Sequence, residues 1–374
     1  MDYETPQFFR VMQYAQRADR DVVDMVSGNP DWEPPQALRE GLRTYADGEP
    51  AEFQYPDSVG LRELREEIAT RRGVDIEQVI VTNGAGEANH LAMAESLEQM
   101  SGDEVLLVDP VYPYYAGRAE MLHADIRFVP ATDRGGLDPA DVYEQISEDT
   151  AAVVINSPNN PLGVTYDAET VHELVAAAEE HDAMLVSDEV YDHFDYSGRF
   201  ESALSVDSPN RIVTNSFSKS MAITGFRVGY AIFPHPDGPN GGLMDGARSR
   251  HMLTNVTSSR PAQAAVLHAL RNTDPSYYEA NRDLLRERID AFTDALDAAG
   301  AEYTEPEGAF YVMARFPGFE GTMDNVERLI DEAGIAGMPG EAFSDTRREW
   351  MRFALVTPRV GEAADRLAAF FDAR

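Results

Sequence analysis

Three features are scarce in this sequence of 374 residues: cysteine, lysine and long apolar runs. Cysteine is absent, which excludes disulfide bonds, thiolate metal ligands and a cysteine nucleophile. No segment approaches the roughly 18 uninterrupted apolar residues of a membrane-spanning helix, so no membrane partner is expected. The first residues, MDYETPQFFRVMQ, start with acidic residues and lack the apolar core of a secretory signal. We therefore expect a soluble, cytoplasmic protein.

Positive charge is also scarce. Lys and Arg total 31 against 66 Asp and Glu, which gives a formal net charge of −35 at pH 7. Binding to nucleic acid requires a basic face that neutralises phosphates, so no nucleic-acid partner is expected. An acidic surface that uses arginine in place of lysine resembles proteins of salt-loving organisms, in which concentrated cations screen the repulsion between carboxylates. We expect a halophilic acidic surface.

Lys219, in the segment SFSKS, is the only lysine of the chain. Arginine and lysine serve about equally as surface charges, but arginine stays protonated in proteins, whereas a partly desolvated lysine can lose its proton. A position that must supply a neutral, nucleophilic amine therefore cannot be occupied by arginine. Chance retention is the alternative, and the residues around Lys219 decide between the two.

The order of predicted elements indicates an α/β fold. From residue 60 onward, helix-like and strand-like segments alternate, which predicts βαβ units and a mostly parallel central sheet flanked by helices. After residue 245, one long helical stretch over 260–300 and several shorter pieces follow. A chain of this length exceeds one compact core. We expect a large domain of residues 45–245 and a smaller α/β domain built from the two chain ends, residues 1–44 and 246–374.

Two glycines follow the predicted strand 79–83 and open a helix. The free N–H groups and the positive dipole end of such a helix favour an anion, most naturally a phosphate, near Gly84 and Gly86. An ordinary strand–helix turn is the alternative, because Asn89 stands where a dinucleotide-binding fingerprint has its third glycine.

Other candidate residues also follow predicted strands, where ligands of open α/β sheets bind. Asp188 ends the segment MLVSD, with Tyr191 three residues later; a helix cap and a metal ligand are the alternatives. No metal site is expected, because the eight histidines are dispersed. Asn160 lies in the loop NSPNNPLG, where a plain turn is the alternative. Arg227 lies between Gly225 and Gly229, which suggests an anion clamp rather than a surface charge.

Together these residues offer a phosphate cradle, an amine for a Schiff base, an acid for a ring nitrogen and donors for a phenolate oxygen. Pyridoxal phosphate needs this set. The sequence resembles the class I/II aminotransferases of pyridoxal-phosphate fold-type I. The resemblance rests on blocks in family order across almost the whole chain: GNPDWEPP (28–35), FQYPDSVGLRELREEIA (53–69), VTNGAGEA (81–88), DPVYPYY (109–115), NSPNNPLGV (156–164), SDEVYDHF (187–194), SFSKSMAITGFRVGY (216–230) and MRFAL (351–355).

The resemblance implies a role for each residue that contacts the cofactor ring. Lys219 would form the Schiff base with the cofactor and move the proton between substrate Cα and cofactor C4′. Asp188 would keep the ring nitrogen protonated. Asn160 and Tyr191 would bond the ring oxygen O3′, and Tyr112 would stack on the ring.

The resemblance also implies contacts to phosphate, substrate and a second subunit. Arg352 would clamp the substrate α-carboxylate with its forked guanidinium, and Gly28 would offer a backbone donor to the same group, beside Asn160. Tyr55 would reach the phosphate of a neighbouring subunit, which implies a homodimer with shared active sites. The phosphate would be bound by Gly84, Ala85, Gly86, Ser216, Ser218 and Arg227.

The activity implied is transfer of the amino group of an L-amino acid to a 2-oxo acid, with 2-oxoglutarate the expected acceptor, by a ping-pong route like that of aspartate aminotransferases. The same fold also hosts C–S β-lyases and decarboxylases, which stay open as alternatives. Arg352 favours transamination, since decarboxylation requires the carboxylate across the ring rather than held in its plane. A non-catalytic regulator is not expected, because residues 1–40 contain no helix-turn-helix and the charge has the wrong sign.

The sequence departs from the family pattern in its Asn/Pro loop, where Ser157 and Leu162 replace the usual Asn and Thr. Glu87 lies near a position where some aspartate-specific relatives have a cation, which puts a preference for dicarboxylates in doubt. Arg250, His251 and Arg260 are candidates for a second anion anchor, with charges on a helix surface as the alternative. The preferred amino acid cannot be predicted from these residues.

Overall fold

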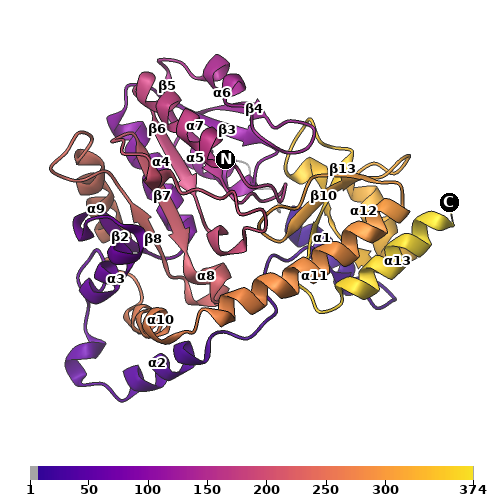
Figure 1. Ribbon diagram of the computed structural model, residues 1–374, viewed down its shortest axis with the longest axis horizontal. Helices are drawn as coiled ribbons and strands as arrows, with labels where there is room; N and C mark the ends of the chain where they lie inside the picture. The colour runs from indigo at the N-terminus through magenta and orange to yellow at the C-terminus, as the bar shows by residue number, and fades with distance from the viewer. Residues whose placement is uncertain (1–6, 374) are drawn as a thin grey trace.

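The larger lobe is built on a seven-stranded sheet (Figure 1). The computed structural model describes residues 7–373. The strand order is β2-β8-β7-β6-β5-β3-β4; β8 runs antiparallel to both of its neighbours, and every other pair is parallel. The predicted α/β fold with a mostly parallel sheet is confirmed. The strands are β2 (Val79–Thr82), β3 (Glu104–Asp109), β4 (Asp125–Pro130), β5 (Thr150–Asn156), β6 (Met184–Asp188), β7 (Arg211–Ser216) and β8 (Gly229–Ile232).

Helices cover both faces of this sheet, so its central strands are buried on both sides. Successive side chains of a strand point to opposite faces. Leu107 of β3 accordingly packs in the cluster formed with α4 (Ala85–Gln99), α5 (Pro113–Met121) and α9 (Gly242–Asn255). Its neighbour Leu106 packs in the cluster that contains α6 (Pro139–Gln145) and α7 (Ala168–Glu180). Burial on both faces explains why these strands read as continuous apolar runs in the sequence.

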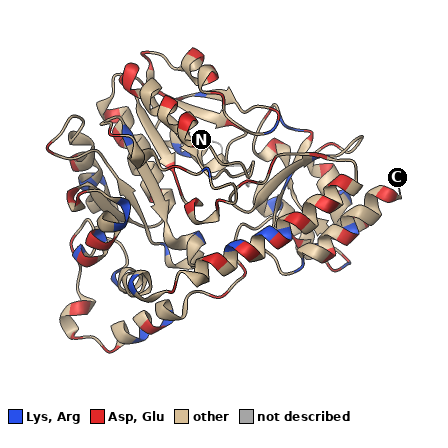
Figure 2. Ribbon diagram, in the orientation of Figure 1, with Lys and Arg blue, Asp and Glu red and all other residues tan. Residues whose placement is uncertain are grey.

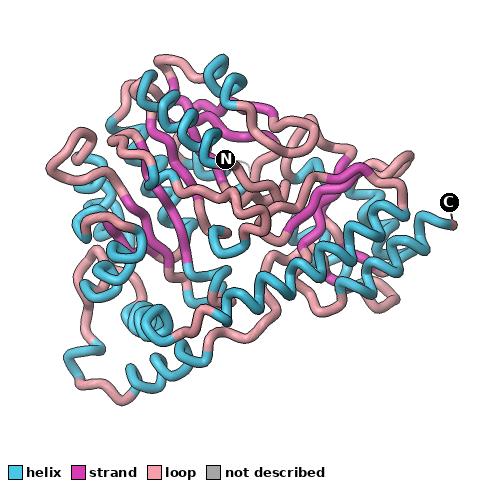
Figure 3. Tube along the Cα trace, in the orientation of Figure 1, coloured by secondary structure: helices cyan, strands magenta, loops and turns pink. Residues whose placement is uncertain are grey.

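The smaller lobe contains a four-stranded antiparallel sheet in the order β12-β13-β10-β9, and β1 pairs in parallel with β11 beside it. Its strands are β1 (Val23–Asp24), β9 (Glu302–Tyr303), β10 (Tyr311–Arg315), β11 (Ile335–Ala336), β12 (Met338–Pro339) and β13 (Trp350–Ala354). Its helices are α1 (Gln7–Arg17), α11 (Ser276–Ala298), α12 (Met323–Ala333) and α13 (Val360–Asp372). The long α11 runs alongside α13 (Figure 3).

Three further helices lie at the lower left in Figure 1: α2 (Gln36–Ala46), α3 (Arg62–Arg72) and α10 (Arg260–Asn272). Helix α10 packs against both α2 and α3. Helix α2 contains the domain boundary expected at residue 45, α3 lies between the two expected boundaries, and α10 follows the one at residue 245. The domain boundaries stay predictions.

The helix expected over 260–300 is two helices, α10 and α11, separated at residues 273–275. Thr273 has an extended backbone, and Pro275 cannot donate the backbone bond that a continuous helix requires. Short helices complete the chain: α8 (Phe217–Ser220) and six 3₁₀ segments at Pro50–Phe53, Ile76–Gln78, Asp192–Phe194, Ala203–Ser205, Thr224–Phe226 and Gly340–Ala342.

Acidic side chains are distributed over both lobes rather than gathered in one segment (Figure 2). Across residues 7–373, no helix combines the length and the apolar composition needed to cross a bilayer.

Candidate active site

Five loops meet at one edge of the large sheet, because the strands that precede them, β2, β3, β5, β6 and β7, all end there. They line a cavity of about 550 Å³ together with segments of the smaller lobe. Of the predicted site residues, the cavity is lined by Gly28, Ala85, Gly86, Tyr112, Asn160, Asp188, Tyr191, Ser216, Ser218, Lys219, Arg227 and Arg352. Gly84 precedes Ala85 in the same turn. Tyr55 lies outside the cavity, with 79% of its surface exposed.

Lys219 lies on the short helix α8, directly after β7. Its Nζ donates a hydrogen bond to the carbonyl oxygen of Gly28, over 2.7 Å. Burial, together with the positive charges of Arg352 and Arg227, lowers the pKa of Lys219 to about 8, against the opposing effect of Asp188. A fraction of this amine is therefore neutral near pH 7, as a nucleophile or proton acceptor requires.

Asp188 ends β6 and is held by three donors. Asn89 Nδ2 and Tyr115 Oη each donate to its Oδ2 over 2.6 Å, and the amide of Val190 donates to Oδ1 over 3.1 Å. Asn89 is fixed in turn by Thr214, whose Oγ1 donates to its Oδ1 over 2.6 Å. Burial raises the pKa of Asp188, and the hydrogen bonds oppose this rise. A cation placed against this carboxylate would keep it ionised.

Asn89 and Tyr115 were not predicted as site residues. Each lies on a helix among apolar neighbours, where a single polar residue is usually satisfied by the core. The available signal was Asn89 itself, an amide on the buried side of the helix that follows the two glycines.

The phenol of Tyr191 lies 3.1 Å from that of Tyr311, a residue of β10 that the sequence did not single out. The main chain of Asn160 is fixed by Asn156, whose Oδ1 accepts its backbone N–H over 2.9 Å. Burial raises the pKa of Tyr191 and of Tyr311, so both stay protonated donors at neutral pH.

The glycine turn before α4 leaves room for an anion beside a guanidinium. Gly84 has φ +84°, a left-handed conformation, and a Cβ there would overlap Arg227 Nη2. Arg227 is anchored by the carbonyl of Thr224, which accepts from its Nη1 over 2.8 Å. The N–H groups that open α4 face the same space, so the turn, the helix end and Arg227 together suit a phosphate.

Arg352 comes from β13 of the smaller lobe and is 5% exposed. Its Nη1 donates to Asn160 Oδ1 over 3.2 Å, and its Nη2 donates to the carbonyl of Val26. Its buried Nε has no hydrogen-bond partner among the described residues. An unsatisfied guanidinium N–H at a cavity wall fits a carboxylate ligand.

These residues fit pyridoxal phosphate. The glycine turn and Arg227 match the phosphate, Asp188 matches the ring nitrogen, and the amine of Lys219 matches the aldehyde. Within residues 7–373, no group of three or more His, Asp or Glu side chains is arranged to hold a metal ion.

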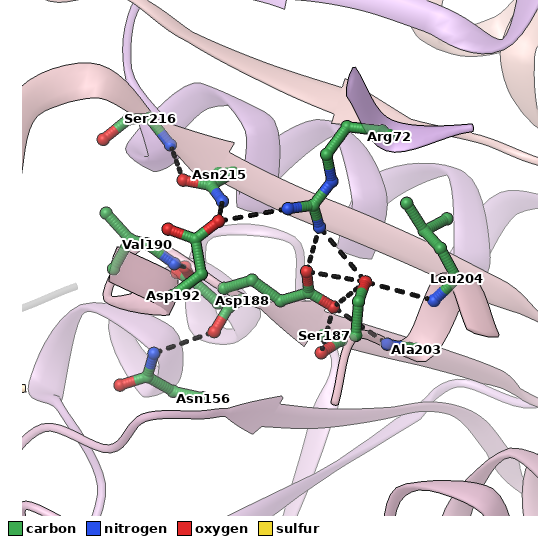
Figure 4. Close-up of polar contacts among 12 residues, drawn as sticks. Arg72, Asn156, Ser187, Asp188, Val190, Asp192, Ala203, Leu204, Asn215 and Ser216 are labelled. Carbon is green, nitrogen blue, oxygen red and sulfur yellow. Dashed lines mark hydrogen bonds and ion pairs between the residues drawn. The ribbon is translucent and has the colours of Figure 1, made fainter. Parts of the chain in front are cut away.

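A buried ionic network lies behind the site (Figure 4). Arg72 of α3 makes ion pairs with Glu189, whose side chain is fully buried, and with Asp192 over 3.0 Å. Asp192 also accepts from Asn215 Nδ2 over 2.9 Å, and Asn215 Oδ1 accepts from the backbone amide of Ser216 over 2.6 Å. The network joins the loop after β6, which carries Tyr191, to the end of β7, which leads into Lys219.

The three candidates for a second anion anchor do not line the cavity. Arg250 pairs with Glu95 over 2.5 Å, and His251 Nδ1 lies 2.7 Å from Glu87 Oε1. Arg260 donates to the carbonyls of Ala51 and Gln54, each over 2.8 Å. The alternative of charges on a helix surface fits Arg250 and Arg260, whereas His251 is a buried residue that contacts Glu87 inside the protein.

The chain is similar to known aminotransferases over nearly its whole length. The family described as aminotransferase class I and II matches residues 20–367. The aspartate aminotransferase of Thermotoga maritima is 34% identical over 365 residues, which is 95% of this chain and 92% of that protein. The aspartate/prephenate aminotransferase of Thermus thermophilus is 32% identical over 360 residues, 93% of this chain and 90% of that protein.

Solved structures of aminotransferases are also similar to this chain. The aspartate aminotransferase from Thermus thermophilus with maleate superposes with a TM-score of 0.89 at 29% identity, covering 98% of this chain and 97% of that one. The Thermotoga maritima enzyme superposes with a TM-score of 0.88 at 31% identity, covering 99% and 98%. The chain therefore belongs to the class I and II aminotransferases, and it is a pyridoxal-phosphate-dependent enzyme of that family.

Proposed function

We propose that this enzyme transfers the amino group of an L-amino acid to a 2-oxo acid, with 2-oxoglutarate as acceptor, in two half-reactions of a ping-pong cycle. One observation carries the proposal: the only lysine of the chain lines the same cavity as Asp188 and Arg352, and the pKa of its amine is lowered to about 8.

The cofactor contacts follow from the donors and acceptors at the cavity wall. When bound, pyridoxal phosphate supplies an aldehyde that condenses with amines and a ring that accepts an electron pair. Asp188 would hold a proton at the ring nitrogen, and Tyr112 would cover the ring. Asn160 and Tyr191 would donate toward the ring oxygen. The phosphate would be bound by the turn of Gly84, Ala85 and Gly86 and by Ser216, Ser218 and Arg227.

The substrate contacts come mostly from the smaller lobe. Arg352 binds the α-carboxylate through its forked guanidinium, assisted by Asn160 and the main chain at Gly28. Lys219, released from the carbonyl of Gly28, takes the proton from substrate Cα and returns it during transfer. Because the carboxylate that Arg352 binds is attached to Cα, Arg352 orients the Cα–H bond toward the amine.

A half-reaction screen tests this proposal. The cofactor-loaded enzyme is mixed with each standard amino acid in the absence of an acceptor, and the visible absorption band of the bound cofactor is followed. Loss of the band, and its return when 2-oxoglutarate is added, is the expected result for at least one amino acid. Release of pyruvate from cystathionine would instead support a C–S lyase, and release of carbon dioxide a decarboxylase.

The most discriminating variant is one that replaces the amine of Lys219. Lys219→Arg keeps a positive charge and is expected to retain the fold while losing turnover and the covalent label that borohydride leaves on Lys219, because a guanidinium does not form a Schiff base. Circular dichroism checks the fold. Turnover retained in this variant would contradict the proposal.

The proposal includes a homodimer in which the two subunits share their active sites. It also includes a cytoplasmic location. The support for the homodimer is that large apolar side chains are left exposed: Tyr55 is 79%, Phe53 is 53% and Leu253 is 83% exposed. Sedimentation measures the subunit number, and Tyr55→Phe is expected to weaken cofactor binding. A monomer at micromolar concentration would remove this part of the proposal.

We also propose that the acidic surface is an adaptation to salt, in line with the net charge of −35. Screening by concentrated cations should raise the thermal midpoint of unfolding between dilute buffer and molar salt. Equal midpoints in the two conditions would contradict this adaptation.

A further inference from the structure

Glu87 is a carboxylate in the first turn of α4, the helix that begins at the proposed phosphate site. Its side chain is only 13% exposed and does not line the cavity. Burial raises the pKa of Glu87, but the hydrogen bonds from His251 and Asn83 outweigh this effect and hold the pKa below its ordinary value. The side chain is therefore ionised at neutral pH. Since like charges repel, a carboxylate so close to a phosphate site must bring a compensating advantage.

Four donors hold this carboxylate in a fixed position. Its Oε2 accepts from the backbone N–H of Asn83 over 2.6 Å and from Nδ2 of the same residue over 2.9 Å. Its Oε1 accepts from His251 Nδ1 over 2.7 Å and from Asn255 Nδ2 over 2.5 Å, and both of these residues lie on α9. An ionised carboxylate only accepts, so Nδ1 is the nitrogen of His251 that carries the proton toward Glu87. Glu87 thus ties α9 to the residue that precedes the glycine turn.

Asn83 connects this carboxylate to the phosphate site. It lies directly before Gly84, which has a left-handed backbone with φ +84°. Its carbonyl oxygen accepts from Nη2 of Arg227 over 3.3 Å. Glu87 therefore fixes the residue from which the turn starts, and the same residue contacts the guanidinium that is proposed to bind the phosphate.

The opposite side of the turn is closed by β8. A Cβ on Gly229 would lie 2.6 Å from the carbonyl carbon of Gly84 and 2.8 Å from the backbone nitrogen of Ala85, so the two backbones are in close contact. The N–H groups of Ala85 and Gly86 open α4, and donors at this position have no partner within the helix. Their direction depends on the conformation of the turn. With β8 on one side, Glu87 holds the turn from the other.

We propose, on the basis of the proposed phosphate site, that Glu87 is a positioning residue for the cofactor phosphate. It does not contact the phosphate itself. It holds Asn83, and through Asn83 the glycine turn and Arg227, in the arrangement that binds the phosphate, while His251 holds Glu87 in place from α9. The better geometry of these donors outweighs the repulsion between the carboxylate and the phosphate.

An ordinary helix cap is the alternative, because a glutamate in the first turn of a helix often accepts a backbone N–H at the helix start. A cap stabilises the whole protein, so its loss would weaken the binding of any form of the cofactor to the same extent. A positioning residue for the phosphate acts only on forms of the cofactor that carry a phosphate.

The test compares pyridoxal phosphate with pyridoxal, which lacks the phosphate, in Glu87→Met. Equilibrium dialysis measures both dissociation constants. The affinity for pyridoxal phosphate is expected to fall about 10-fold or more, as for the loss of a hydrogen bond to a charged group, while the affinity for pyridoxal should change little. Repulsion between charges alone predicts the opposite, tighter binding of pyridoxal phosphate once the carboxylate is removed.

Two further variants separate the acceptor from the charge and from the helix contact. Glu87→Gln removes the charge but keeps one oxygen, which can accept both hydrogen bonds from Asn83, so it should keep most of the affinity for pyridoxal phosphate. Glu95→Met is the matched control, because Glu95 also lies on α4, is 1% exposed and pairs with Arg250 of α9 over 2.5 Å. It should lower the thermal midpoint of unfolding and leave the ratio of the two dissociation constants unchanged.

Hydrogen exchange of the full-length chain without cofactor provides a readout that involves no binding. The backbone N–H of Asn83 should exchange faster in Glu87→Met than in the wild type or in Glu87→Gln, measured by mass spectrometry on peptides that cover the turn. His251→Leu removes a donor to Glu87 and should change the ratio of dissociation constants in the same direction. It should add little in the double variant with Glu87→Met, because His251 acts through Glu87.

Three results would overturn the inference: an unchanged ratio of dissociation constants in Glu87→Met, tighter binding of pyridoxal phosphate in that variant, or an equal change of the ratio in Glu95→Met. If Glu87→Met does not fold, His251→Leu decides in its place, and an unchanged ratio there would overturn the inference. A wild-type enzyme that binds pyridoxal as tightly as pyridoxal phosphate would instead refute the proposed phosphate site, and the inference with it.

Discussion

Removing the charge of Arg72 should destabilise the protein strongly, because its partner Glu189 is fully buried. Arg72→Met would leave that carboxylate with only neutral donors, the hydroxyls of Ser202 and Ser187 and the backbone amide of Ala203. Breaking a buried pair in this way costs about 3–5 kcal/mol of the free energy of unfolding. The measurement is the midpoint and slope of urea unfolding of the cofactor-loaded enzyme.

A surface pair gives the matched control. Arg62 and Glu66 form an ion pair in which the side chains are 75% and 47% exposed. Arg62→Met removes the same charge and should cost no more than about 1 kcal/mol, since exposed pairs contribute little. The double variant Arg72→Met/Glu189→Gln should recover part of the loss, because the unpaired charge is removed as well.

The loss of stability caused by Arg72→Met should also depend on pH. Burial raises the pKa of Glu189, and the charge of Arg72 opposes this rise, so the variant has a still higher pKa. A carboxyl whose pKa is raised in the folded state contributes stability below its unfolded pKa and loses it as the pH rises through its folded pKa. The penalty of Arg72→Met should therefore be larger at pH 8 than at pH 5. A penalty below about 1 kcal/mol, or one that does not change with pH, would refute the assignment of a buried, ionised pair.

Three further predictions concern the cavity. Gly84→Ala should weaken cofactor binding, measured by equilibrium dialysis, because its Cβ would overlap Arg227 and strain a left-handed backbone. Gly73→Ala controls for the backbone strain alone, since no atom lies within 4 Å of a Cβ there. In the cofactor-free protein, the lowered pKa of Lys219 predicts that stability rises as the pH increases from about 8 toward 10.5, and a flat profile would contradict it. Tyr115→Phe should raise the pKa of Asp188 further, since it removes a donor, and carbon NMR of the labelled carboxyl measures the shift.

The residues at strand ends could be predicted from the sequence, because the carboxyl ends of parallel strands meet at one edge of a sheet. Lys219, Asp188 and Asn160 follow three different strands, and the cavity contains all three. The alternation of helices and buried strands was enough to predict the fold class. The break between α10 and α11 was missed, although Pro275 marks it.

The site residues that lie within helices could not be predicted from their position after a strand. Asn89 and Tyr115 lie within helices, where a polar residue among apolar ones reads as part of the core. Arg72 reads as a surface charge, because a helical arginine usually is one. Its partners Glu189 and Asp192 lie more than a hundred residues away in the sequence, so only the packing of α3 against the sheet reveals what it contacts.

The cavity lies where the two lobes meet, and several hydrogen bonds join its two walls, among them the one between Tyr191 and Tyr311. Lys219 reaches the smaller lobe through the carbonyl of Gly28, and Arg352 reaches the larger lobe through Asn160. The amine proposed to move the proton and the guanidinium proposed to seat the carboxylate thus come from different lobes, but the hydrophobic cluster that contains Leu106 of the large sheet also contains Phe353 of the smaller one. Because this shared interior is closely packed, a rotation of one lobe would require its repacking, so the core holds the separation of the two groups as firmly as their own hydrogen bonds do.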